Sequence, residues 1–556
     1  MAEREVINLD SDSSEDDDLR RAIALSLQDQ NTIDDEPEAI DAPKNTENSA
    51  PNDHVTFGGI ALNRKEMEEA RLNRLGKRRR NSNEPSMGEP QVKRPAAQQS
   101  GPKGPQARYT QGIVRRTWTR GYPKTSDDIT IEEVFQKEEL QLALLSSFQW
   151  DEEWLLSKID IRRTRVLLLA FAASEEQVMY HLSVMATIMT RADRIRRQKQ
   201  TMRDNVPENI RFCFPPMHGP GSMHSKLQLL KYPNYLRLVI PTGNLVPYDW
   251  GETGVMENMA FLIDLPRLEA TGSRRMTEFG ENVANFLRAA GVDGTMMRSL
   301  ASYDFTATEE LGFVYSIPGG HTGEALRRVG ATVRGLGLAT DTPIEVDLAC
   351  ASLGAVNYGL ISAIYNACQG DDGMREYNAR VNQKINSKAA RQTEVLRDHF
   401  RIFFPTDQTV AMSKGGRQSA GTICIQAKWW RAPSFPRELV RDCINNRKGL
   451  LMHSKIIFVR SPAGARLIGQ KSAGWAYIGS ANLSESAWGR VVKDRGTGNA
   501  KMSCRNWECG VVMPVKGNTD SGNDFTMFSG AVPVPMIVPG RLYDKDEKPW
   551  FYLGAQ

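Results

Sequence analysis

Cysteine is scarce and scattered in this chain of 556 residues. The seven cysteines are odd in number, and no two of them form a Cys-x2-Cys pair. That usage is typical of a reducing compartment and disfavours a zinc module. No apolar run approaches the roughly eighteen residues that span a bilayer, and the acidic start lacks the layout of a secretory signal. We therefore expect a soluble intracellular protein with no membrane partner.

Motifs that hold metals or nucleotides are also missing. The sequence contains no His-Glu-x-x-His, no Walker loop and no cluster of carboxylates that would bind a metal. Each of these would have placed a divalent ion or a nucleotide phosphate at a defined spacing. We therefore expect chemistry that uses neither a metal nor another cofactor.

Opposite charges are concentrated in two N-terminal segments. Residues 1–54 contain sixteen Asp or Glu against four Lys or Arg, whereas residues 64–124 contain sixteen Lys or Arg against five Glu. Such segments have too little apolar surface to offset the entropy of ordering. They predict a disordered acidic tail at 1–55 and a disordered basic linker at 56–140. The basic runs at 77–80 and 93–95 indicate a nuclear import signal, a nucleic-acid contact or a solvated charge run, and we expect a nuclear protein.

Two short motifs stand in the acidic tail. Val6, Ile7 and Leu9 form a β-prone patch, followed by acidic and phosphorylatable residues at 10–16, which resembles a SUMO-interacting motif. Such a patch can add a strand to a partner's sheet, and phosphorylation would strengthen the charge contacts. A helical pattern follows and resembles a ubiquitin-interacting motif, with its contact positions at Leu19, Ala22, Ile23 and Ser26. The alternative for both motifs is a tail that only solubilises the protein.

The tetrapeptide Met-His-Ser-Lys occurs twice, at 223–226 and at 452–455. Each copy leads through apolar segments to Asn-Leu and then to Trp-Gly, with Trp six residues after Asn: Asn244 and Trp250 in the first copy, Asn482 and Trp488 in the second. The period exceeds two hundred residues, which is too long for solenoid or propeller repeats. The repeat therefore predicts two related domains.

The flanking patterns predict α/β domains with the site between them. If each His-x-Lys lies on a strand, the His and Lys side chains share one face, and each Asn falls at a strand end, where open sheets bind ligands. We expect two pseudo-symmetric domains with mixed sheets at 141–320 and 321–556, with the boundary after a strand at 312–317. An amphipathic helix is expected over 174–203.

The repeated residue types suit a phosphodiester. Lys supplies positive charge and Asn supplies amide donors for non-bridging oxygens. His serves as a nucleophile or exchanges a proton near neutral pH. With two histidines, one can attack phosphorus while the other protonates the leaving oxygen. An isolated His or Asn is more often structural, and the matched pair is what favours a catalytic site.

At these residues the chain resembles the phospholipase D superfamily, whose mark is a duplicated His-x-Lys. Phospholipase-type sites read His-x-Lys-x4-Asp, but Lys231 and Arg460 occupy the two Asp positions here. Loss of both aspartates is typical of the tyrosyl-DNA phosphodiesterase branch, which this chain resembles from about residue 140 to the C-terminus. The resemblance implies two α-β-α sandwich domains with mixed sheets. It also implies a monomer that removes topoisomerase-derived tyrosyl peptides from blocked 3′ ends of single-stranded or nicked DNA.

The resemblance also assigns roles to residues. It implies that His224 is the nucleophile and forms a covalent phosphohistidine, and that His453 is the general acid and then the base. The phosphoryl oxygens would be held by Lys226, Lys455, Asn244 and Asn482. Across the domains, Glu508 would orient His224 and Glu257 would orient His453. The family commonly has Gln near the position of Glu257, so a carboxylate there would raise the pKa of its histidine.

Contacts to DNA are expected from two further positions. Ser352 lies in a segment that resembles a backbone-contacting loop of the family, and Lys428 places a cation beside aromatic residues. Two alternatives remain open on the sequence. One is a lipid-directed phospholipase or phosphatidyltransferase, which the missing aspartates disfavour. The other is a ubiquitin- or SUMO-binding adaptor with inert catalytic domains, which two intact His-x-Lys copies disfavour.

Overall fold

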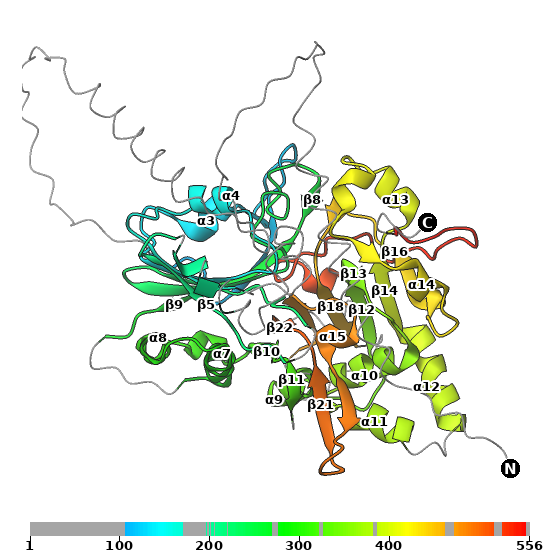
Figure 1. The fold of residues 1–556 in the computed structure, drawn as a ribbon. Helices are drawn as coiled ribbons and strands as arrows, with labels where there is room; N and C mark the ends of the chain where they lie inside the picture. Colours follow the sequence, from blue (N-terminus) through cyan, green and yellow to red (C-terminus); the bar gives the residue numbers. More distant parts are fainter. Residues whose placement is uncertain are drawn as a thin grey trace, which may run out of the picture.

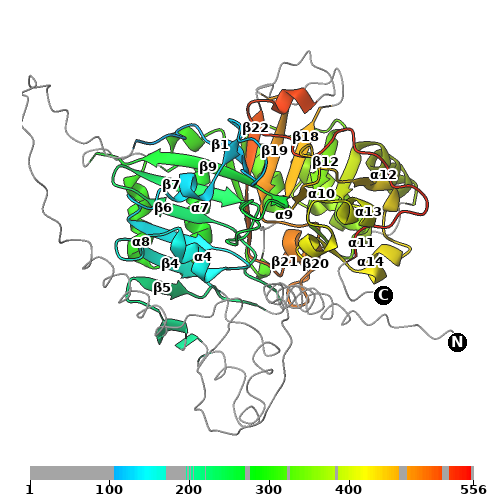
Figure 2. The same cartoon turned by 90° about the horizontal axis from the view of Figure 1, so that it is seen from above.

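A computed structural model of the chain describes residues 106–170, 206–218, 221–269, 276–321, 326–381, 386–461, 472–515 and 525–551, with a few residues between 196 and 204. They form a mixed α/β protein with several mixed sheets, as predicted (Figures 1 and 2). The predicted SUMO and ubiquitin motifs, and most of the helix predicted at 174–203, lie outside the described residues. Within those ranges, no helix is both long and apolar enough to cross a bilayer.

The first half is built on an eight-stranded sheet with helices on both faces (Figure 1). Its strands, in spatial order, are β2 (Asp128–Ile129), β1 (Ile113–Thr117), β9 (Met259–Pro266), β7 (Tyr235–Pro241), β6 (Gln228–Lys231), β3 (Leu142–Ser146), β4 (Arg165–Leu169) and β5 (Ile210–Cys213). The helices α3 (Ile131–Phe135) and α4 (Glu152–Ser157) cover one face, while α7 (Glu278–Ala289) and α8 (Gly294–Ser299) lie on the other. The central strands are buried on both faces, which explains their continuous apolar sequences.

The second half is built on a seven-stranded sheet. Its spatial order is β10 (Gly312–Ser316), β22 (Glu508–Val515), β19 (Gly474–Gly479), β18 (Ile456–Arg460), β12 (Glu345–Ala349), β14 (Phe400–Phe404) and β16 (Val440–Asp442). Its helices are α9 (Leu326–Gly335), α10 (Tyr358–Cys368), α11 (Met374–Val381), α12 (Asn386–His399), α13 (Asp407–Ala411), α14 (Ala427–Arg431) and α15 (Glu485–Trp488). A hairpin of β20 (Arg490–Lys493) and β21 (Ala500–Cys504) pairs with β11 (Gly319–His321) at one side.

The two sheets have the same topology. From β1 to β5 and from β10 to β16, corresponding strands stand in the same order with the same parallel and antiparallel pairings. Each half therefore contains one copy of the unit that carries the repeated tetrapeptide. The pseudo-symmetric pair of domains inferred from the repeat is present in the structure.

The structure differs from the sequence prediction at both domain starts. The strand at 312–316 is β10, which pairs with β22, so it opens the second half and does not close the first. Likewise, β1 at Ile113–Thr117 pairs with β9 and belongs to the first sheet, although it lies in the stretch predicted as disordered linker. Each strand finds its partner about 150 or more residues away, and the adjacent Arg115 and Arg116 hid β1 within a basic window.

The two sheets pack against each other directly. One hydrophobic cluster contains buried side chains from both, including Leu238, Ile240 and Phe261 of the first sheet and Phe458, Ile478 and Val511 of the second. Figure 2 shows the two sheets side by side with β22 and β19 next to β9 and β7. Burial of this apolar interface favours one fixed arrangement of the halves. The ends of β6 and β18 that carry the tetrapeptides can therefore meet.

The repeated Trp-Gly pairs have a structural role. Trp250 and Trp488 are buried, as expected for core packing, and the glycines after them, Gly251 and Gly489, both have φ of +75°. A Cβ on Gly251 would lie 2.2 Å from the carbonyl oxygen of Trp118. Only glycine fits that left-handed turn, so the Trp-Gly repeat reflects a turn shared by both halves.

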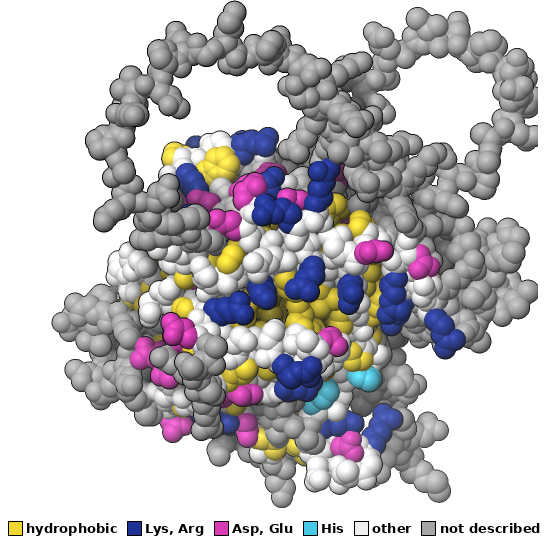
Figure 3. All heavy atoms as spheres, turned by 90° about the vertical axis from the view of Figure 1, so that its left-hand side faces the viewer, with side chains coloured by type: hydrophobic (Ala, Val, Ile, Leu, Met, Phe, Trp, Pro, Cys, Tyr) yellow, Lys and Arg dark blue, Asp and Glu magenta, His cyan; other side chains and the backbone are white. Residues whose placement is uncertain are grey.

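Basic side chains also occur away from the interface between the halves. On the outer face of the first half, Lys and Arg surround an apolar area (Figure 3). Burial, with the nearby charges of Arg267 and Arg165, lowers the pKa of Lys231 on β6. Positive charge is therefore spread widely and does not by itself locate a nucleic-acid surface.

Candidate active site

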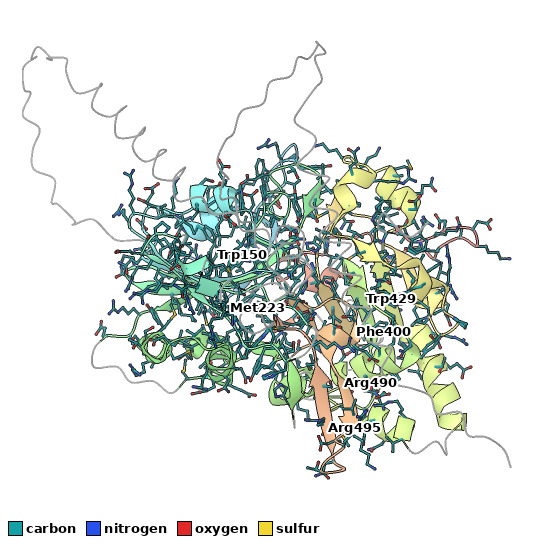
Figure 4. The ribbon with its side chains drawn as sticks, in the orientation of Figure 1. Trp150, Met223, Phe400, Trp429, Arg490 and Arg495 are labelled. Carbon is teal, nitrogen blue, oxygen red and sulfur yellow. The ribbon has the colours of Figure 1, made fainter. Side chains whose placement is uncertain are left out.

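The two tetrapeptides converge on one cavity between the halves. The cavity has a volume of about 190 Å³, and both His224 and His453 line it. Its remaining walls come from both halves, including Phe148, Gln149, Asn244, Ser352, Trp429, Asn482, Ser484, Glu485, Arg490, Arg505 and Glu508. Figure 4 labels Met223, which precedes His224 in the first half, and the cavity-lining Trp429 and Arg490 of the second half. The predicted meeting of the two copies is therefore present.

His224 is held by residues of the second half. Met223 forms a parallel bridge with Trp507, and the His224 N–H donates to the Trp507 carbonyl oxygen at 3.1 Å. The ring Nδ1 lies 2.9 Å from Glu508 Oε2, so the predicted contact between Glu508 and His224 is present. Lys226 Nζ lies 3.3 Å from His224 Nε2, which places the two side chains on the same side even though both precede β6.

His453 is held in the same way by the first half. The strand β17 (Leu451–Met452) pairs in parallel with β8 (Met256–Glu257), and the His453 N–H donates to the Glu257 carbonyl oxygen at 3.1 Å. Nδ1 lies 2.9 and 3.1 Å from the two carboxylate oxygens of Asp249. Lys455 Nζ donates to the carbonyl oxygens of His453 at 2.6 Å and of Thr242 at 3.1 Å.

The carboxylate on His453 is therefore Asp249, and the prediction that Glu257 orients this histidine is wrong. The Glu257 side chain forms an ion pair with Arg447 at 3.2 Å. Glu257 pairs with Met452, which precedes His453, just as Trp507 pairs with Met223, which precedes His224. Glu257 therefore corresponds to Trp507, and the next residue, Asn258, corresponds to Glu508. The hydroxyls of Thr242 and Ser480 donate to the side chains of Asn258 and Glu508, respectively.

The second half therefore holds His224 through one residue, Glu508, whereas the first half holds His453 through two residues, Asp249 and Asn258. Asn258 Nδ2 donates to Asp249 Oδ1 at 3.0 Å, and Asp249 in turn contacts His453. The position of Ala487, before Trp488, matches that of Asp249, before Trp250. The sequence offered one signal for Asp249: a carboxylate precedes the repeated Trp in one copy only.

The two asparagines are fixed by backbone donors. Asn244 Oδ1 accepts from the Gln149 N–H at 3.3 Å, and Asn482 Oδ1 accepts from the Ser352 N–H at 3.1 Å. The carbonyl side of each amide is therefore engaged. Asn244 Nδ2 also donates one hydrogen to Gln149 Oε1 at 3.3 Å, so its second amide hydrogen and the Nδ2 group of Asn482 are the candidate donors to a ligand. Ser352, predicted to contact DNA, lines the cavity, and its backbone N–H orients Asn482.

Lys428 lies beside an aromatic ring, as predicted. Its side chain is exposed, with Nζ 5.8 Å from the ring centroid of Trp429, and it is Trp429 that lines the cavity. Phe148 lines the cavity too, with its ring centroid 5.1 Å from that of His224. Phe148 was missed in the sequence, because a single aromatic residue in apolar surroundings gives no signal that separates it from core residues.

Burial controls the ionisation of the site. It lowers the pKa of His224 to about 4, although Glu508 opposes the shift, and that of His453 to about 4, although Asp249 opposes it. Burial likewise lowers the pKa of Lys226 to about 8 and holds that of Lys455 well below its usual value. Both imidazoles are therefore neutral at neutral pH. An entering anion would favour their charged forms and those of the lysines.

Comparisons with known proteins identify the family of this chain. The family described as tyrosyl-DNA phosphodiesterase matches residues 113–544, and the ubiquitin interaction motif matches residues 14–30. The crystal structure of the yeast tyrosyl-DNA phosphodiesterase is similar, with a TM-score of 0.56 and 18% identity over 79% of this chain and 100% of that chain. A histidine-to-asparagine mutant of the yeast enzyme gives 0.54 and 19% over 79% and 100%.

At these identities the structural likeness shows the fold, while the family match covers most of the chain and begins at the first residue of β1. The tetrapeptides, Asn244, Asn482 and Glu508 all lie within the matched range. The chain therefore belongs to the tyrosyl-DNA phosphodiesterase family and is an enzyme of that family.

Proposed function

We propose that this enzyme hydrolyses the 3′-phosphotyrosyl bond between DNA and a topoisomerase-derived peptide through a covalent phosphohistidine at His224. The observation that carries the proposal is the pair of imidazoles lining one cavity, each with its Nδ1 on a carboxylate of the opposite half. With Nδ1 protonated and bonded to a carboxylate, Nε2 is the atom left to react.

In the first step, His224 Nε2 attacks phosphorus. A nitrogen–phosphorus bond forms, the bond to the tyrosyl oxygen breaks, and His453 gives its Nε2 proton to that oxygen. Burial supports the first role, because a pKa of about 4 leaves the His224 lone pair free at neutral pH. The second role requires His453 to be protonated in the complex. The negative charge of the phosphodiester and the Asp249 carboxylate both favour that form.

In the second step, His453 acts as the base. It takes a proton from water, the oxygen attacks phosphorus, and the nitrogen–phosphorus bond breaks, which releases a 3′-phosphate and neutral His224. Throughout, Lys226, Lys455 and the amides of Asn244 and Asn482 would hold the non-bridging oxygens. Charge that develops on those oxygens is then stabilised by groups already in place.

We propose that no metal ion takes part. The amides of Asn244 and Asn482 line the cavity, and the buried Lys226 and Lys455 lie beside the two histidines that line it. These groups supply the positive charge and donors with which a metal would otherwise neutralise the phosphoryl oxygens. The DNA is proposed to bind as a single strand or at a nick, with Ser352 on the cavity wall as one contact.

The test is incubation with a 3′-phosphotyrosyl oligonucleotide in EDTA. Wild type should release tyrosine and leave a 3′-phosphate at an unchanged rate, whereas His453→Ala should release tyrosine slowly and accumulate a covalent adduct. Loss of tyrosine release in EDTA, with recovery on adding Mg²⁺, would contradict the metal-independent route.

A second role, binding of ubiquitin, is favoured by the match at residues 14–30. We propose that Leu19, Ala22, Ile23 and Ser26 contact ubiquitin, that Val6, Ile7 and Leu9 contact SUMO, and that the enzyme works as a monomer in the nucleus. Titration of labelled ubiquitin with the full chain and with Ala22→Arg tests the first of these contacts. Equal binding by both proteins would contradict it.

A further inference from the structure

A segment of the second half crosses to the first half just before His453. It runs from Asn445 to His453 and includes β17. Tyr122 of the first half donates its hydroxyl hydrogen to the Lys448 carbonyl oxygen at 2.7 Å, and the Leu451 N–H donates to the Val255 carbonyl oxygen at 3.0 Å. The position of His453 is therefore set by contacts with the opposite half.

Arg447 is the charged anchor of this segment. Its guanidinium forms ion pairs with two carboxylates of the first half, those of Asp128 and Glu257, whose side chains are fully buried. The Arg447 side chain is itself only 10% exposed. Its backbone N–H donates to Asn445 Oδ1 at 2.7 Å, which fixes the turn from which it reaches across. A planar guanidinium can serve two carboxylates at once, whereas an ammonium is a point charge.

The carboxylates depend on this cation. Burial raises the pKa of Glu257 to about 7, although the charges of Arg447 and Arg116 oppose the shift, and Asp128 adds to it. Without Arg447, Glu257 and Asp128 would share a buried site with Arg116 as their remaining charged neighbour, 3.6 Å from Asp128. An uncompensated buried charge is costly, so the segment would move or Glu257 would take up a proton.

Glu257 connects the anchor to the histidine. Its side chain pairs with Arg447, and its carbonyl oxygen accepts from the His453 N–H. The corresponding contacts of the His224 segment are hydrogen bonds of Ser222 with Asn506 and Trp507. A shift of Arg447 would therefore displace the His453 backbone through Glu257, which contacts both residues.

We propose that Arg447 is a positioning residue: by bridging Asp128 and Glu257, it holds the segment that carries His453 at the distance from the leaving oxygen that proton transfer requires. The inference rests on the proposed function, in which His453 is the acid of the first step and the base of the second. It predicts that losing Arg447 impairs proton transfer more than nucleophilic attack.

The experiment compares two leaving groups on the same oligonucleotide, 3′-phosphotyrosine and 3′-(4-nitrophenyl phosphate), in single turnovers with excess enzyme. In Arg447→Met, tyrosine release should slow by about 10²-fold, the loss expected for a misplacement of roughly 1 Å. Release of nitrophenol, which needs little protonation, should slow by less than about threefold. The phosphohistidine should also persist longer, because the same imidazole activates water.

Two further variants distinguish a positioning defect from a folding defect. Glu257→Gln removes one ion pair with little change of shape, and it should slow tyrosine release selectively by a smaller factor. Arg460→Met removes a buried ion pair with Asp347, 2.6 Å long, within the second half. It should lower the melting temperature without slowing the release of tyrosine more than the release of nitrophenol.

Equal slowing of both leaving groups in Arg447→Met, or unchanged release of both from a folded variant, would overturn the positioning role. Wild-type enzyme that forms no adduct at His224 would overturn the proposed mechanism and this inference with it, and that result is visible before any variant is made. A selective loss in both Arg447→Met and Glu257→Gln supports the inference.

Discussion

Replacing Asp249 by Asn tests how the site gives its two histidines different roles. Asp249 accepts from His453 Nδ1, from the Asn244 N–H at 2.6 Å and from Asn258 Nδ2. A hydrogen bond to a charged group contributes about 1.5–3 kcal/mol. Because the carboxylate stabilises the imidazolium more than the neutral ring, most of that energy would be lost from the first transition state. That predicts a fall in tyrosine release of roughly 10- to 150-fold.

The variant also has a cost in stability. Whichever way the new amide turns, its NH2 group faces a donor, either the Asn244 N–H or the donors on Oδ1. One unsatisfied buried group costs about 1–3 kcal/mol. Thermal unfolding should therefore be followed beside the kinetics, and activities compared well below the melting temperature.

The matched control is Glu508→Gln. Glu508 holds His224, so this variant should slow attack on phosphorus and affect tyrosyl and 4-nitrophenyl substrates alike in single turnovers. Asp249→Asn should affect the tyrosyl substrate far more. The reasoning is refuted if Asp249→Asn slows both substrates equally, or if Glu508→Gln is the variant that discriminates.

Three further predictions concern ionisation and the repeated turn. Binding of a 3′-phosphorylated oligonucleotide at pH 7 should take up about one proton, because the anion raises the depressed pKa of His453; calorimetry in buffers of different ionisation enthalpy measures this, and no uptake would contradict it. Both histidines have folded pKa values of about 4, below their ordinary 6.5, so the unfolded chain binds more protons between these limits. Stability should therefore be full above pH 6.5 and fall as pH drops towards 4, by about 3 kcal/mol per histidine. A denaturant series from pH 7 to 4.5 without that loss would contradict this prediction. Gly251→Ala should destabilise by more than about 1 kcal/mol, because alanine is strained at φ +75° and its Cβ would contact Trp118; an unchanged melting temperature would show that the turn relaxes.

The repeated residues were predictable because each copy supported the other. His224 with His453, and Asn244 with Asn482, stood out as pairs, and the structure brings all four to one cavity. The α/β class followed in the same way from apolar runs beside each copy. Repetition supplied a comparison within one chain, which a single sequence otherwise lacks.

The unpaired residues were harder to predict. Asp249 has alanine at its matching position, and Glu257 lies one residue from the true counterpart of Glu508, so the family resemblance led to the wrong acid. The distance from Asn to this acid position differs between the halves because β20 and β21 are inserted in the second. Arg447 gave no signal, because its carboxylate partners come from the other half.

The strands that open each half were assigned wrongly for a related reason: β1 was placed in the disordered linker, and β10 was predicted as a strand but placed in the first half. β1 and β10 pair with strands far along the chain, so neither sits beside its partner in the sequence. β1 was assigned to the linker because basic residues surround it. β10 was assigned to the first half because it follows that half directly in the sequence. Their membership of a sheet is set by long-range pairing.

The central claim is that His224 and His453 act on one phosphorus atom from opposite sides. A crystal structure of the enzyme with vanadate, an oligonucleotide ending in a 3′-hydroxyl and a tyrosyl peptide tests it most directly. The account predicts vanadium bonded to His224 Nε2, with the tyrosyl oxygen opposite and within roughly 2.6–3.2 Å of His453 Nε2. Vanadium bonded to His453, or bound out of reach of either ring, would contradict it.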